Sequence, residues 1–151
     1  MDWRFGLMLT VFLLLLAVAG YGVRKLVSVL ARQFGGGGGW AALAKVFATS
    51  RPMPPSVLFG QNIVVGRVIY RRSMSVGSDD AGLYLEPGFP VAIFVKQRLF
   101  IPWAEIRKVE ESVLFWRKAF RLSIGAPCIG EVTAQAETVD RVIRPHIRLP
   151  A

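Results

Sequence analysis

The chain has 151 residues, 53% of them hydrophobic, and a formal net charge of +9. This length has room for one membrane segment and one domain of roughly 90 residues. The single cysteine, Cys128, excludes an intrachain disulfide. The excess positive charge lies in residues 24–151. It suggests an anionic binding partner, either lipid headgroups, nucleic acid or an acidic protein.

The first segment is apolar, with 19 uncharged residues from Phe5 to Val23. As a helix it would be roughly 28 Å long, which is close to the hydrocarbon thickness of a bilayer. The alternative is a cleaved signal peptide, because Ala17–Ala19 resembles a cleavage site. The apolar run continues past that site, however, and Arg24 and Lys25 follow it directly. This stop-transfer arrangement favours a retained anchor.

The charges that flank the apolar segment predict its orientation. Arg24, Lys25 and Arg32 follow it, whereas only Arg4 precedes it among basic residues. The positive-inside rule then places the C-terminal body in the cytoplasm. Residues 1–34 are predicted to form a transmembrane anchor with a basic amphipathic extension. That extension either meets the membrane surface or a partner helix, or is a frayed helix end with solvated charges.

Residues 35–57 are predicted to be a linker. The glycines of Gly35–Gly39 lack the lysine and hydroxyl of a phosphate-binding loop, so they predict a flexible hinge. Apolar residues then recur at helical spacing over Trp40–Phe47. Trp40 suits the membrane interface, and packing on the globular domain is the open alternative. Arg51–Pro55 is a proline-rich spacer, where the domain boundary is expected.

From about residue 58 the period becomes strand-like, and residues 58–148 are predicted to form the domain. The expected strands are Val68–Val76, Leu83–Glu86, Val91–Val95, Leu99–Ile101, Ile106–Val109, Phe120–Ile124 and Ile129–Thr133. Arg72 breaks the alternation and marks a bulge. A C-terminal helix would place Val139, Val142, Ile143 and His146 on one face, with Pro145 near its end. The fold class is therefore mainly β (α+β), with a small antiparallel barrel or sandwich plugged by that helix.

The strand segments carry a resemblance. "GLYLE", a variable loop, "LFIPWAEIRKVE", further strands and a terminal helix resemble bacterial domains of the pleckstrin-homology type, including the GRAM-like group. The resemblance implies that Pro102 lies at a strand bend and that Trp103 fills the space beside it. The core residues predicted to be buried together are Leu85, Ile101, Trp103, Phe120, Leu122, Val139 and Ile143.

The sequence favours a protein without catalysis, metal or cofactor. Asp79-Asp80 and Glu110-Glu111 are the adjacent carboxylate pairs, and neighbours on a strand face opposite sides. The first pair is better explained by a turn. Cys128 and His146 are a conceivable catalytic dyad, but Cys128 is interpreted as a small buried residue and His146 as a helix-end residue. No His, Cys and carboxylate cluster has metal-ligand spacing.

The basic residues near two expected hairpin tips form the candidate binding patch, which comprises Arg71, Arg72, Arg117, Lys118 and Arg121. It would contact anionic lipid or a protein partner. The alternatives are a membrane-tethered nucleic-acid-binding barrel, suggested by FWRKAFR, and simply the solvated outer face of the sheet. Against nucleic acid, Phe120 falls on the apolar face of its strand.

These observations predict a single-pass protein of the bacterial inner membrane with a cytoplasmic domain. It would bind a protein partner or an anionic lipid surface at that face of the membrane, without catalysis. The residues expected at the membrane interface are Arg24, Lys25, Arg32 and Trp40.

Overall fold

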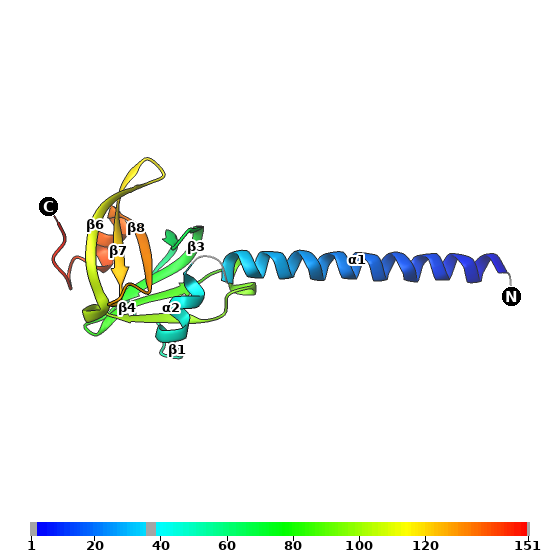
Figure 1. Ribbon diagram of the computed structural model, residues 1–151, viewed down its shortest axis with the longest axis horizontal. Helices are drawn as coiled ribbons and strands as arrows, with labels where there is room; N and C mark the ends of the chain where they lie inside the picture. Colours follow the sequence, from blue (N-terminus) through cyan, green and yellow to red (C-terminus); the bar gives the residue numbers. More distant parts are fainter. Residues whose placement is uncertain (1–2, 36–38, 151) are drawn as a thin grey trace.

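The protein consists of a long N-terminal helix and a β domain (Figure 1). A computed structural model describes residues 3–35 and 39–150, and within the first helix the side-chain environment of residues 6–29. That helix, α1, runs unbroken from Trp3 to Gly35. Its segment Gly6–Val29 is long and apolar enough to cross a membrane and is 0% buried against the rest of the protein. The predicted apolar helix and its continuation beyond the span are confirmed. The hinge was predicted over Gly35–Gly39, and its residues 36–38 lie outside the described residues.

The domain is built on one curled antiparallel sheet. The described residues form eight strands in the order β1-β5-β4-β3-β2-β8-β7-β6. The sheet curls into a half-barrel. The predicted antiparallel β fold with a C-terminal helix is confirmed at this level, with one or two more strands than expected. The strands are β1 Ala48–Thr49, β2 Leu58–Val65, β3 Val68–Ser78, β4 Gly82–Pro87, β5 Arg98–Pro102, β6 Ile106–Leu114, β7 Arg117–Ile124 and β8 Gly130–Gln135.

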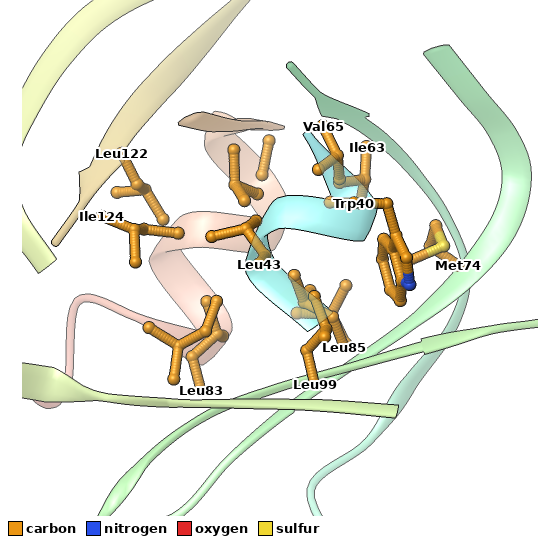
Figure 2. Close-up of a cluster of buried hydrophobic side chains, with 14 of the residues drawn as sticks. Trp40, Leu43, Ile63, Val65, Met74, Leu83, Leu85, Leu99, Leu122 and Ile124 are labelled. Carbon is orange, nitrogen blue, oxygen red and sulfur yellow. The ribbon is translucent and has the colours of Figure 1, made fainter. Parts of the chain in front are cut away.

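Two helices, α2 (Trp40–Phe47) and α3 (Ala136–Val142), contribute to the core with the strands. Figure 2 shows Leu43 of α2 pointing among side chains from several strands, including Leu122 and Ile124 of β7 and Leu99 of β5. The strand alternation places every second side chain on this concave face. Of the seven core residues predicted, Leu85, Ile101, Phe120, Leu122, Val139 and Ile143 are at most 1% exposed, and Trp103 is half-buried against them.

The position of α2 corrects the expected domain boundary. Trp40 is 2% exposed and Leu43 is 0% exposed, and both belong to the main hydrophobic cluster. Residues Ala48 and Thr49 then pair with β5. The globular unit therefore begins near Trp40, upstream of Arg51–Pro55. Trp40 is not a membrane-interface residue, because its indole packs edge-on against Tyr70 at 6.0 Å inside the core.

One expected strand is wrong. Val91–Val95 is apolar at every position, but Val91–Ile93 forms the short 3-10 helix η1 in the loop between β4 and β5. Pro90 precedes it in a helical conformation, and the amide nitrogen of Val95 donates to the carbonyl of Val91. Val91 and Val95 are both buried, so the packing of this helical turn holds the loop in place, without strand pairing. A second 3-10 helix, η2 (Trp103–Glu105), joins β5 to β6 at the predicted Pro102 bend.

Candidate functional site

Two of the predicted arginines, Arg71 and Arg72, lie at a bulge in β3. Gln61 pairs with Met74 and Ile63 with Tyr70, so the extra residues of β3 lie opposite Asn62 alone. The predicted bulge at Arg72 is confirmed, and its φ of 47° is in the left-handed region. The Arg72 amide donates to the side-chain Oδ1 of Asn62 at 3.0 Å. Arg71 and Arg72 are thus in the middle of an eleven-residue strand, not near its end as expected.

The turn between β6 and β7 supplies the other wall of the site. Leu114 pairs with Arg117, which leaves Phe115 and Trp116 as a two-residue turn with φ values of 51° and 63°. Such turns favour asparagine or glycine, since other residues are strained in this region. Strain of this kind is found preferentially at functional sites. Trp116 is 99% exposed at the tip of the hairpin that rises from the sheet in Figure 1.

The bulge and the turn together border an open cavity of about 600 Å³, here called the basic groove. Its lining residues are Asn62, Arg71, Arg72, Phe115, Arg117 and Gln135. Asn62 comes from β2 and Gln135 from β8, and these two strands lie between β3 and β7 in the sheet. The guanidinium of Arg71 lies 4.6 Å from the centre of the Phe115 ring, in cation–π contact. The groove therefore crosses four strands.

The groove carries the positive charges of three arginines. Among the described residues, no ion pair is formed by Arg71, Arg72 or Arg117. The other lining side chains are two amides and one aromatic ring. Guanidinium groups offer paired N–H donors that match the oxygens of phosphate and carboxylate, and amides add further donors. The arrangement can bind an anionic group.

The remaining two members of the predicted patch lie elsewhere. Alternation along β7 places Lys118 on the opposite face from Arg117. There its Nζ is 2.8 Å from Glu111 Oε1 and 5.4 Å from the Phe120 ring. Arg121 pairs across the sheet with Glu110. The hydrogen bond and charge of Lys108 lower the pKa of Glu110, and the charge of Arg121 adds to this effect. The five-residue patch is therefore corrected to a three-arginine groove.

The residues predicted at the membrane interface do not lie together in one place. Arg24 and Lys25 are exposed on α1. The side chain of Arg32 lies outside the described residues. Trp40 is in the core, as given above.

Asp79 stabilises a turn, as the sequence predicted for the Asp79-Asp80 pair. Its Oδ1 accepts hydrogen bonds from the amides of Ala81 and Gly82, at 2.8 and 3.0 Å, and its Oδ2 accepts one from the Tyr84 hydroxyl at 2.8 Å. Desolvation raises the pKa of this carboxyl, but these hydrogen bonds, with the charge of Arg51, outweigh it, and the pKa is lowered. Asp79 is held as an acceptor rather than as an acid.

The candidate dyad residues have different surroundings. Cys128 is exposed in the turn between β7 and β8, so the prediction that it is buried is wrong. The α3 helix ends at Val142, and His146 lies beyond it with its ring stacked on Trp103 at 4.8 Å. Within the described part of the chain, no group of three or more His, Cys, Asp or Glu residues could hold a metal ion.

Sequence reasoning missed half of the groove. Asn62 and Gln135 lie outside all the predicted strands, and Phe115 lies between the predicted strands Ile106–Val109 and Phe120–Ile124. The available signal was the FWRK stretch, in which two bulky aromatics occupy a turn before two cations. Aromatic residues without glycine or asparagine are unusual there.

No protein-family model, curated protein or solved structure matches this chain.

Proposed function

We propose that this protein is a non-catalytic binding module, held at a membrane by α1, whose β domain binds anionic groups in the basic groove. The observation that carries the proposal is the convergence of Arg71, Arg72 and Arg117 from two non-adjacent strands without an acidic partner among the described residues. Like charges are brought together at an electrostatic cost, and an anionic ligand would offset that cost.

The chemistry of the groove fits two sources of the anionic group. One is the phosphate of a lipid headgroup, and the other is an acidic segment of a protein partner. Each basic residue close to an anionic leaflet contributes about 1 kcal/mol, so three of them matter together. A pleckstrin-homology-like identity of the domain, which is part of this proposal, is compatible with both sources.

The proposed location is the bacterial inner membrane, with the domain in the cytoplasm. Its support is the charge difference across the span, where Arg24, Lys25 and Arg32 follow the apolar segment and only Arg4 precedes it among basic residues. In that orientation the domain faces the leaflet to which polybasic surfaces bind.

One observation favours a second candidate, which is single-stranded nucleic acid. Trp116 is 99% exposed beside the groove, and an exposed aromatic ring next to arginines can stack on a base. Phe120, by contrast, is 1% exposed and cannot stack. A single exposed ring gives a short platform, so this candidate ranks second.

The groove is tested with residues 39–151, which contain the whole hydrophobic cluster, and with liposomes of varied anionic lipid content. We expect Arg71→Ala with Arg117→Ala to weaken binding to anionic liposomes about 20- to 30-fold, since two contacts of about 1 kcal/mol are lost. The matched control is Arg107→Ala with Lys108→Ala, which removes the same charge from β6.

An equal loss in both variants would show that only total charge matters and would reject the groove. A parallel capture from native membranes with the full chain separates the sources. A protein that the wild type retains and the groove variant loses identifies an acidic partner. Competition by a single-stranded oligonucleotide at low concentration would instead support the second candidate.

A further inference from the structure

The end of the β domain nearest to α1 carries exposed apolar side chains that the groove does not involve. The loop between β4 and β5 projects towards the end of α1 in Figure 1. It presents Phe89, which is 81% exposed, and Ile93, which is 57% exposed. Large apolar side chains at a loop tip are disfavoured in water unless a surface covers them. The question is what covers these two.

The chain itself restricts where this loop lies. The connection from Gly35 to Trp40 can reach at most about 18 Å when fully extended, so α2 begins close to the end of α1 in any conformation. The loop borders a cavity of about 420 Å³ with α2, to which Trp40, Lys45, Phe94 and Lys96 contribute. The loop is therefore near the end of α1 as well.

The length of α1 sets the height of this end above a bilayer. The uncharged run ends at Val23 and the longer candidate span at Val29, so α1 continues beyond the span for about 18 or about 9 Å before it ends at Gly35. The polar headgroup layer of one leaflet is about 5–8 Å deep. The end of α1 thus lies at the headgroup surface or up to about 13 Å above it, and the connection of at most about 18 Å allows the start of α2 to reach that surface.

The charges at this end suit the same surface. Lys45 on α2, Lys96 in the loop and Arg67 in the turn between β2 and β3 are all exposed. That turn adjoins the start of α2, because a Cβ added to Gly39 would lie 3.5 Å from the Cα of Gly66. Among the described residues none of the three cations forms an ion pair. Aromatic and aliphatic side chains beside lysines and arginines are typical of interfacial membrane contacts.

We propose that the loop between β4 and β5 enters the interfacial layer of the bilayer that α1 spans, with Phe89 and Ile93 inserted and Lys45, Arg67 and Lys96 at the lipid phosphates. The loop is then a second contact that sets how the domain is oriented on the membrane. This inference rests on the proposed anchoring by α1 and is independent of the basic groove.

The test uses the full chain in liposomes, with Cys128→Ser as background and single cysteines labelled with an environment-sensitive fluorophore. The positions are Phe89→Cys in the loop, Leu14→Cys in α1 and Arg107→Cys on β6. Lipids brominated in their acyl chains quench only labels that enter the bilayer. We expect quenching and a shift to shorter wavelength at positions 14 and 89, and neither at position 107.

The outcomes separate the inference from its premise. If the label at position 14 is quenched and the label at position 89 is not, the loop does not insert and the inference is overturned. If the label at position 14 is not quenched either, the anchor itself fails. A label at position 89 that is shielded from aqueous iodide but unaffected by brominated lipid means that protein covers the loop, which also overturns the inference.

Discussion

At the scale of single residues, Trp103 connects parts of the fold that are far apart in the sequence. Trp103 begins η2 directly after the bend at Pro102. Its indole Nε1 donates to the carbonyl of Asp79 at 2.9 Å, and its ring stacks on His146 at 4.8 Å. It therefore ties the turn before β4 and the chain after α3 to the start of β6, although the ring is only half-buried.

Replacement of Trp103 by alanine measures this role. We expect Trp103→Ala to lower the free energy of unfolding of residues 39–151 by about 2–3 kcal/mol, at the low end for tryptophan because the ring is partly exposed. Urea denaturation checks it. The matched control is Trp116→Ala, which removes a ring that is 99% exposed and should change stability by at most about 0.5 kcal/mol. Equal effects of the two would contradict the packing role.

Among the elements, α2 decides where the β domain begins, because its side chains belong to the core. Its eight residues place Trp40, Leu43 and Phe47 in the core, while Val46 on the other face is 59% exposed. A Cβ on Gly130 of β8 would lie 3.0 Å from Leu43, so the helix is in close contact with the sheet. An isolated helix of this length is not stable in water, and its packing holds it in place.

Removal of α2 is expected to unfold the domain. A fragment that begins at Ser56 loses three large core side chains, each worth about 2–5 kcal/mol, and total stability is only about 5–15 kcal/mol. Circular dichroism should show a cooperative transition for residues 39–151 and none for residues 56–151. In the longer fragment, Leu43→Ala should cost about 2–5 kcal/mol and Val46→Ala almost nothing. A folded short fragment would refute the role of α2.

On the scale of the whole molecule, α1 and the β domain are arranged end to end, with the two chain ends at opposite extremes of Figure 1. This arrangement brings the loop between β4 and β5 near the end of α1. The basic groove lies between the β3 bulge and the β6–β7 turn. The two proposed contacts meet at the β3 bulge, because the amide of Gly88, next to Phe89, donates to the carbonyl of Ser73, next to Arg72.

The exposed thiol of Cys128 gives a direct measure of orientation. If the domain is cytoplasmic, a membrane-impermeant maleimide should label Cys128 in inside-out membrane vesicles and leave it unlabelled in right-side-out vesicles. The Cys128→Ser variant should give no signal in either preparation, which identifies the labelled site. Labelling in right-side-out vesicles would place the domain on the outer side, as cleavage of the apolar segment would also do.

The sequence by itself determined the features that depend on local periodicity. The apolar helix, most strands, the C-terminal helix and the bulge at Arg72 follow from the spacing of apolar residues along the chain. Spacing also identifies which face of a strand is buried, as for Phe120 and Leu122. For the same reason it did not separate Val91–Val95 from a strand, because a short apolar run fits both.

Only the tertiary structure decided which faces meet. An amphipathic helix such as α2 buries its apolar face equally well against a membrane or a sheet, and the choice depends on the space inside the curled sheet. The groove is similar, since Arg71 and Arg117 come from β3 and β7, with β2 and β8 between them. Their approach depends on the curl of the sheet, the bulge at Arg72 and the strained turn at Phe115. Strand order and curl are long-range properties, and residue spacing along the chain does not encode them.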